Sequence, residues 1–184
     1  MDRDATERRA DSQRAYQDDP EFVDRNYQVP SLADLLSAAG VVGVARFIEL
    51  PSFEPERLFT FVYHPKVIAV SAVIGASSLW WSMSEGERFD PTRALRRSAV
   101  CEPWARICPP LLRSWAALRA ASVSAGDCST DTMLDGIGYR HRLADHEFRS
   151  DTEWSNPKLP EHAPQVALIK GYVQLLRGVE LYPK

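Results

Sequence analysis

The stretch VVGVARFIELPSFEPERLFTFVYHPKVIAVSAVI, residues 41–74, alternates runs of β-branched and aromatic residues with short breaks at Pro51 and at His64-Pro65-Lys66. Apolar runs of this length between proline-containing breaks are typical of strands. The predicted strands are residues 41–50, 58–63 and 67–74, with a fourth at 78–83 after Gly75-Ala76. Because the connections are short, we expect these strands to pair as an antiparallel meander.

Three helical regions are predicted around this meander. Ser31 and Asp34 have the spacing of a capping box at the start of the first. Asp90 followed by Pro91 is a typical start for the second, because Asp caps a helix and Pro is favoured at its first position. The third has apolar residues at helical spacing. Their ranges are 32–39, 91–122 in pieces divided by prolines, and 164–178.

A late hairpin completes the expected sheet. Residues 137–143 and 146–154 are predicted strands, joined by a turn at Ala144-Asp145. This turn would place His141 opposite Phe148 and Arg142 opposite Glu147. The order of helix, strands, helices, hairpin and helix predicts an α+β fold, with an antiparallel sheet (the meander plus the C-terminal hairpin) and helices packed on one face.

Charge separates the chain into two parts. The 184 residues carry a formal net charge of −3. Residues 1–30 contain eight acidic and five basic residues, so the rest of the chain is neutral. They show no continuous apolar face. The prediction is an acidic flexible arm over residues 1–30 and a single domain over residues 31–184. A neutral body gives no reason to expect nucleic acid as a partner.

Compartment and membrane contact follow from cysteine usage and from one uncharged stretch. Three cysteines form no even set, and the start Met1-Asp2-Arg3-Asp4 has no apolar leader, so a reducing cytoplasm is expected. Residues 67–84 lack charge but contain several serines, and two strands explain them better than a membrane span. No cofactor and no membrane contact are expected.

Three short motifs carry a resemblance. They are RFIELPSF at residues 46–53, LDGIGY at 134–139 and WSNP at 154–157. The chain resembles a group of small uncharacterised bacterial proteins that pair an R-F-x-x-L-P-S-F strand with a late L-D-G-x-x-Y … W-S-x-P hairpin, over about residues 31–178. This resemblance implies a bacterial source and an α+β fold, and it brings no activity and no catalytic residues. The general build is also similar to that of toxin-neutralising immunity proteins.

The segment 139–149, YRHRLADHEFR, is the richest in side chains that could do chemistry. His141, Asp145 and His146 are candidates for acid–base or metal chemistry, with Asp131 or Asp135 as a further carboxylate. Against this, alternation along a strand puts His141 on an inward face as a packing residue. No residue is therefore predicted to be catalytic or to bind a metal ion, and the enzyme hypothesis is kept as an alternative.

Binding candidates come from the same segment and from one tryptophan pair. Arg140, Arg142 and Arg149 could contact an acidic partner surface, although nearby acidic residues could neutralise them. Trp80 and Trp81 would point to opposite faces of the predicted strand at 78–83, which would leave one of them on the open sheet unless the arm covers it. Exposed tryptophans are favoured anchors of protein interfaces.

The sequence therefore favours a non-catalytic protein that binds another protein, with an immunity-type protein and its cognate toxin as the leading example. Two alternatives stay open. One is a small hydrolase or metal-dependent enzyme that uses the region of His141, Asp145 and His146. The other is a self-associating structural protein, for instance a homodimer.

Overall fold

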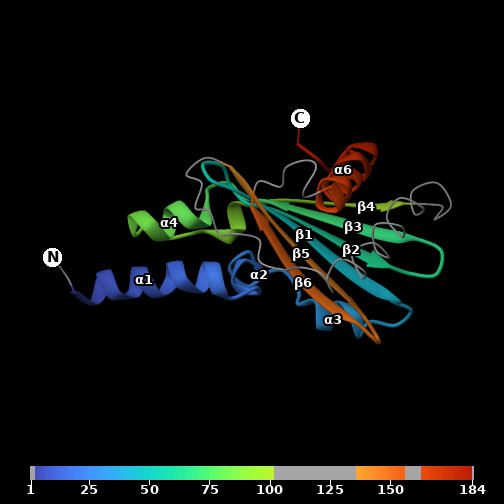
Figure 1. Ribbon diagram of the computed structural model, residues 1–184, viewed down its shortest axis with the longest axis horizontal. Coiled ribbons are helices and arrows are strands. Elements are labelled where there is room, and N and C mark those ends of the chain that lie inside the picture. The colour runs from blue at the N-terminus through green and yellow to red at the C-terminus, as the bar shows by residue number, and fades with distance from the viewer. Residues whose placement is uncertain (1–2, 102–135, 156–162, 184) are drawn as a thin grey trace.

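The computed structural model describes residues 3–101, 136–155 and 163–183. Its centre is a six-stranded antiparallel sheet in the order β4-β3-β2-β1-β5-β6, with helices around it (Figure 1). The strands are β1 Gly43–Pro51, β2 Arg57–Tyr63, β3 Ile68–Ile74, β4 Leu95–Cys101, β5 Ile137–Asp145 and β6 Arg149–Ser155. The helices are α1 Arg3–Asp18, α2 Phe22–Asn26, α3 Leu32–Leu36, α4 Leu79–Glu85, the 3-10 turn η1 Pro91–Arg93, and α6 Ala163–Gly178. The predicted α+β class with an antiparallel sheet is confirmed.

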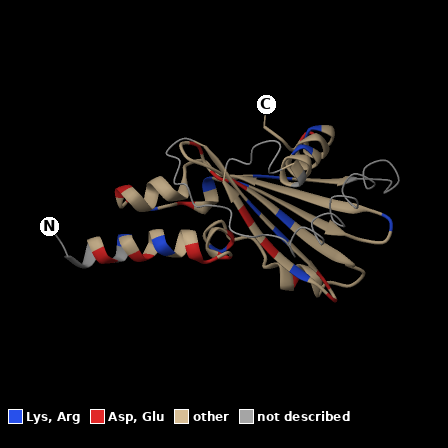
Figure 2. Ribbon diagram, in the orientation of Figure 1, with Lys and Arg blue, Asp and Glu red and all other residues tan. Residues whose placement is uncertain are grey.

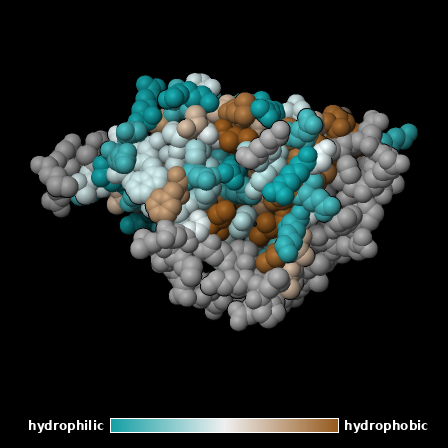
Figure 3. All heavy atoms as spheres, turned by 90° about the horizontal axis from the view of Figure 1, so that it is seen from above, coloured by the Kyte–Doolittle hydropathy of each residue, from teal (hydrophilic) through white to brown (hydrophobic). Residues whose placement is uncertain are grey.

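Helices cover both faces of this sheet, whereas the sequence predicted helices on one face only. On one face, which Figure 3 shows from outside, α6 packs Leu168 and Tyr172 against Phe47 and Phe61. On the other face α3 packs against Val44 and neighbouring residues, and Figure 1 shows α3 and α6 on opposite sides of the strands. Because each face has its own cover, β1 is buried at nearly every position rather than at alternate ones.

The first three strands of the predicted meander and the C-terminal helix are confirmed, with shifts of one or two residues at their ends, and the short helix after Ser31 forms but ends earlier, at Leu36. The predicted hairpin also forms, but its turn lies further on. Asp145 Oδ1 accepts hydrogen bonds from the backbone N–H groups of Glu147 and Phe148 at 2.8 and 2.7 Å, which fixes a turn over residues 145–148. As a result, Arg142 lies opposite Asp151 rather than Glu147, and His141 lies opposite Thr152 rather than Phe148.

The predicted strand at residues 78–83 is wrong, because this segment is helix α4. Ser78 is its N-cap and accepts a hydrogen bond from Trp81 N at 3.3 Å. The helix ends at Gly86, whose φ of 75° lies in the left-handed region that glycine adopts without strain. The uncharged stretch 67–84 is therefore divided between β3 and α4, and no helix in the described parts of the chain has the length and apolarity needed to cross a membrane.

The start of the predicted helical region 91–122 is also corrected. Asp90 caps as expected and accepts a hydrogen bond from Thr92 N at 3.0 Å, but the helix is a single 3-10 turn. The chain then enters β4, which pairs with β3 at the edge of the sheet. An edge strand exposed along much of its length does not need the apolar alternation by which strands are recognised. The remainder of that region, from residue 102, lies outside the described residues.

The N-terminal segment differs from the flexible arm predicted for residues 1–30. It forms α1 and α2, and Val23 and Tyr27 are completely buried. Helix α1 lies beside α4 (Figure 1), where Gln13 Nε2 donates to Ser84 Oγ at 2.9 Å. Residues 19–30 are thus part of the folded body, because Val23 and Tyr27 complete a core cluster that the sheet and α4 leave open.

Candidate functional site

A row of polar side chains crosses the sheet on the face that α2 covers. The member of this row on β1 is Arg46, which lies between the apolar residues Val44 and Ile48 on the same face of the strand. Figure 2 shows basic and acidic residues on the central strands. The members lie opposite one another on successive strands: Ser98, Ser71, Thr60, Arg46, Arg142 and Asp151. We call these six residues the polar row.

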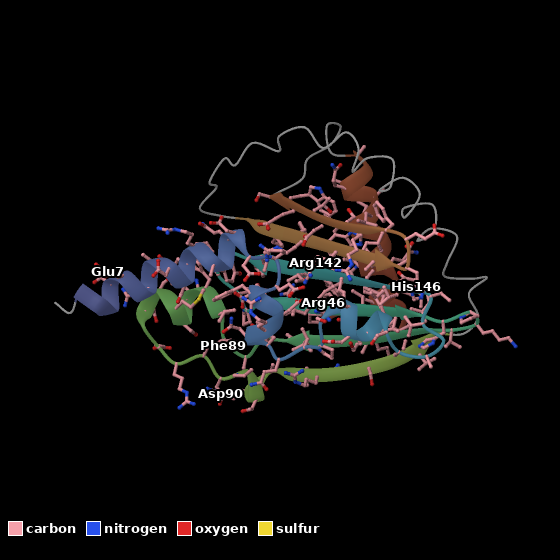
Figure 4. All side chains as sticks on the ribbon, turned by 90° about the horizontal axis from the view of Figure 1, so that it is seen from below. Glu7, Arg46, Phe89, Asp90, Arg142 and His146 are labelled. Carbon is pink, nitrogen blue, oxygen red and sulfur yellow. The ribbon has the colours of Figure 1, made fainter. Side chains whose placement is uncertain are left out.

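Asp24 of α2 contacts the centre of the polar row. Its Oδ2 atom accepts hydrogen bonds from Arg46 Nη1 and from Arg142 Nη1, the latter at 2.6 Å. The side chains of Arg46 and Asp24 are 0% and 3% exposed. Figure 4 shows the two arginines on neighbouring strands. Burial raises the pKa of the Asp24 carboxyl and lowers the pKa of Arg46, and the opposite charges act against both shifts.

The predicted binding residues Arg140 and Arg142 do not form an exposed basic face. Arg142 also pairs with Glu21 at 2.9 Å and with Asp151 at 3.2 Å. Arg140 pairs with Glu153 at 2.6 Å, and its guanidinium faces the backbone carbonyls at the end of α1, at 3.4 Å from the carbonyl oxygen of Gln17. Both arginines are buried and attach the N-terminal helices to the sheet.

Arg149, the third predicted arginine, is exposed at the start of β6. It lies opposite Ala144 in the register, beyond the end of the buried ion pairs. Of the predicted basic face, Arg149 is thus the one residue that the structure leaves exposed.

A pocket of about 390 Å³ lies beside the ion pairs, over the other half of the polar row. Thr60, Ser71 and Ser98 contribute hydroxyl groups to it, and Arg46 lies at one end. The cover comes from the link between α2 and α3 and from α3 itself. The apolar lining residues are Val29, Pro30, Leu35, Val62, Ala72 and Val73, and Arg96 and Arg97 of β4 complete the lining.

A second buried carboxylate, Glu56, organises the start of α4. Its side chain is completely buried, and its two oxygens accept five hydrogen bonds. The donors are Tyr16 Oη at 3.0 Å, Tyr27 Oη at 2.8 Å, Ser78 Oγ at 3.3 Å, Leu79 N at 2.8 Å and Trp80 N at 3.2 Å. No arginine or lysine of the described residues pairs with it. Glu56 therefore connects α1, α2 and α4 through hydrogen bonds alone.

The predicted tryptophan pair divides between two environments. Trp80 is half-buried and meets Tyr16 of α1 edge-on, with ring centroids 5.3 Å apart. Trp81 is 39% exposed, and its ring stacks on that of Phe53, which is 64% exposed, at 6.2 Å. Trp81 Nε1 donates to the carbonyl oxygen of Ser52 at 3.1 Å, which fixes the ring. We call Phe53 and Trp81 the aromatic pair.

The candidate catalytic residues do not come together. His141 is completely buried on the α6 face, hydrogen-bonded to Tyr172 Oη at 2.8 Å, and burial lowers its pKa to about 3. Asp145 holds the hairpin turn, and His146 lies at the far end of β5, hydrogen-bonded to the carbonyl oxygen of Val41 at 3.1 Å (Figure 4). Asp131 and Asp135 lie outside the described residues, and within the described ones no three His, Cys, Asp or Glu side chains could hold a metal ion.

Sequence reasoning did not find Asp24, Arg46 or Glu56. A usable signal exists for Arg46, because a charged residue between apolar residues of the same strand face must bury its charge and needs a partner. Asp24 lies in the segment interpreted as an arm, and Glu56 in a loop whose partners are distant in sequence. Their roles depend on contacts that no local pattern encodes.

Comparison of the chain with models of protein families, with curated proteins and with solved structures found no match.

Proposed function

We propose that this chain is a non-catalytic protein that binds another protein, with the aromatic pair as the anchor of its interface. The observation that supports the proposal is the exposed stack of Phe53 on Trp81. Large aromatic side chains that are already fixed in place lose little conformational freedom on binding, and they supply most of the energy in many interfaces.

The surroundings of the aromatic pair indicate the chemistry of the partner. Glu54 follows Phe53 directly, and its side chain is 62% exposed and pairs with Arg57. Arg57 also pairs with Glu49, so these three residues together keep one net negative charge. Glu85 is exposed four residues after Trp81, which puts both on the same side of α4. An apolar anchor with an acidic rim fits a partner surface that offers an apolar recess with basic residues around it. A basic toxin of the kind that immunity proteins neutralise is the partner class to test first.

The two alternatives receive less support. The enzyme hypothesis needs His141 near Asp145 or His146, and these residues lie apart, with His141 enclosed in the core. Self-association would put the aromatic pair of one copy against that of another, and the acidic Glu54 and Glu85 of both copies would then meet. A partner of different sequence avoids that repulsion.

The proposal is tested by photo-crosslinking at the aromatic pair. Phe53 is replaced by a photoreactive benzoylphenylalanine in the full chain, and cells are irradiated. We expect one adduct with a polypeptide of different sequence, which mass spectrometry identifies. Adducts with a second copy of the chain alone would establish the self-association alternative, and the absence of any adduct would contradict an interface at this position.

Affinity measurements with the identified partner complete the test. The variants Phe53→Ala and Trp81→Ala should each weaken binding by about 30-fold, the effect of a typical interface anchor. Val100→Ala is the matched control, because Val100 is equally exposed at 64% but lies on β4. For the immunity assignment, co-expression of the chain should restore growth to cells that produce the partner, and Trp81→Ala should abolish this rescue.

A further inference from the structure

The pocket over the polar row has a composition that the protein-binding proposal does not use. Its volume of about 390 Å³ falls within the usual range for small-molecule sites. Its lining contains arginines and hydroxyl groups but no Asp or Glu residue. Pockets with apolar walls and a few converging polar groups are the common form of ligand sites.

The polar groups of the pocket lie in one line. Thr60, Ser71 and Ser98 occupy successive neighbouring strands, so their side chains repeat at the strand spacing of about 4.8 Å. Thr60 Oγ1 accepts a hydrogen bond from Arg46 Nε at 3.0 Å, which leaves its own proton available to another acceptor. Among the described residues, no hydrogen bond involves the side chains of Ser71 or Ser98. Three hydroxyl donors therefore line the floor of the pocket.

Positive charge lies at two sides of this floor. Arg46 is held rigidly, since its guanidinium donates to Asp24, to Thr60 and to the carbonyl oxygen of Pro30 at 2.8 Å. Two of its five N–H groups remain beyond these three bonds. On the other side is Arg96 of β4, which is exposed and donates to the carbonyl oxygen of Tyr27. No described carboxylate forms an ion pair with Arg96.

We propose that this pocket binds a small organic monocarboxylate with a compact apolar body. The carboxylate would accept hydrogen bonds from the hydroxyl groups of Thr60 and Ser71 and would lie between the charges of Arg46 and Arg96. The apolar body would contact Val29, with the other apolar lining residues around it. A single negative charge matches Arg96, which lacks a carboxylate partner among the described residues. Arg97 also borders the pocket, but it pairs in register with Ala72 of the α6-face core, so alternation along β4 directs its side chain to the opposite face of the sheet.

This proposal is independent of the protein interface, because none of the pocket residues belongs to the aromatic pair. The probes are benzoate, its neutral analogue benzamide, and inorganic phosphate, each titrated into the full chain and followed by two-dimensional NMR. We expect saturable binding of benzoate with a Kd of about 1 mM or tighter. Benzamide and phosphate should bind at least about tenfold more weakly, since benzamide lacks the charge and phosphate lacks the apolar body.

Variants locate the site. Ser71→Val removes a hydroxyl group and fills the floor, and Arg96→Gln removes the charge at the rim; each should weaken benzoate binding by at least about tenfold. Ser98→Ala, at an exposed position, is a milder change to the same floor and should weaken binding by a smaller factor. Ser150→Ala on β6 is the control and should leave binding unchanged.

Each contrary result overturns the proposal. Equal binding of benzoate and benzamide would show that charge plays no part, and tighter binding of phosphate would make this a site for a different ligand. Absence of benzoate binding, or unchanged binding in Arg96→Gln and Ser71→Val when both variants unfold at the temperature of the parent protein, would exclude a carboxylate site here.

Discussion

Asp24 and Glu56 are both buried carboxylates, yet the molecule accommodates them in opposite ways. Asp24 lies between two arginines, whereas Glu56 has no cationic partner in the described chain and accepts five hydrogen bonds from neutral donors. Both attach N-terminal helices to the rest of the fold: Asp24 holds α2 to the sheet, and Glu56 joins α1, α2 and α4. The molecule thus stabilises a buried negative charge in two ways, by ion pairs at Asp24 and by hydrogen bonds from neutral donors at Glu56.

A buried ion pair and a buried carboxylate with neutral donors differ in how many charged groups must leave water. Pairing Asp24 with Arg46 and Arg142 removes three charges from water. Burial raises the pKa of Asp24 and lowers the pKa of Arg46, and each of these shifts favours the neutral form of the side chain. Glu56 removes only one charge, and two of its donors are the backbone N–H groups of Leu79 and Trp80 at the first turn of α4, which need acceptors in any case. We therefore expect the two sites to respond differently to the same chemical change.

The largest effect is expected when the charge of Asp24 is removed. Asp24→Asn keeps the shape but leaves Arg46 and Arg142 buried without a shared counter-charge, so the free energy of unfolding should fall by about 3–5 kcal/mol. Urea denaturation followed by circular dichroism measures this. If Asp24→Asn were too unstable to fold, that result would also agree with the predicted fall in the free energy of unfolding.

A triple variant tests the same site without isolating a charge. In Arg46→Met, Asp24→Leu, Arg142→Met all three buried charges become apolar side chains, and the partly exposed Glu21 and Asp151 stay in water. The stability should return to within about 1–2 kcal/mol of the parent protein, or exceed it. If the triple variant were as unstable as Asp24→Asn, the cause would be packing and not unbalanced charge.

Glu56→Gln is the equivalent change at the second carboxylate, and its effect should be smaller. The hydroxyl donors Tyr16, Tyr27 and Ser78 can reorient to accept from the new amide, but the backbone N–H groups of Leu79 and Trp80 cannot. One of these N–H groups would face an NH₂ group, and an orphaned buried donor costs about 1–3 kcal/mol. A loss of 4 kcal/mol or more, on the scale of about 3–5 kcal/mol for an uncompensated buried charge, would show that Glu56 depends on its charge as strongly as Asp24 does.

The contrast between these sites also explains which parts of the fold could be predicted. The first three strands of the meander and the last helix were predictable because their apolar patterns match their own secondary structure. The strand expected at residues 78–83 was wrong because α4 depends on Glu56, more than twenty residues earlier in the chain, to accept hydrogen bonds from its first turn. β4 was missed because an exposed edge strand carries no alternating pattern.

The candidate site was predictable only in its residue types. The sequence singled out Arg140 and Arg142 as possible contacts for an acidic partner, and the acidic groups that they meet belong to this chain. The partner of Arg142 is Asp24, more than a hundred residues away, in a segment whose polarity suggested a flexible arm. Trp81 was identified as a possible anchor for the wrong reason, since its exposure arises on a helix and not on a strand.

His141 is a third buried titratable group, and its burial makes the stability of the fold depend on pH. The pKa of His141 falls from 6.5 to about 3 on burial. Between these values the unfolded chain binds a proton that the folded chain excludes, so stability is full above pH 6.5 and is lost as the pH falls. The expected loss is about 1.4 kcal/mol for each pH unit below 6.5.

Urea midpoints measured from pH 7 to pH 5 test this dependence, with His141→Gln as the comparison. The glutamine side chain can still hydrogen-bond to Tyr172 but does not titrate. The slope should therefore flatten in the variant, and equal slopes in the two proteins would place the acid sensitivity elsewhere.

The smallest effect is expected at the rim of the Asp24 site, where Glu21→Gln removes a partner of Arg142. The Glu21 side chain is 46% exposed, so water screens its charge, and Arg142 keeps Asp24 and Asp151 as partners. The loss should be about 0.2–1 kcal/mol by urea denaturation, well below that of Asp24→Asn. Glu21 and Asp24 contact the same guanidinium, that of Arg142. Comparing Glu21→Gln with Asp24→Asn therefore changes how deeply the lost carboxylate is buried but not the cation with which it pairs. A loss equal to that of Asp24→Asn would mean that the number of charges around Arg142, and not the desolvation of Asp24, determines the stability of this site.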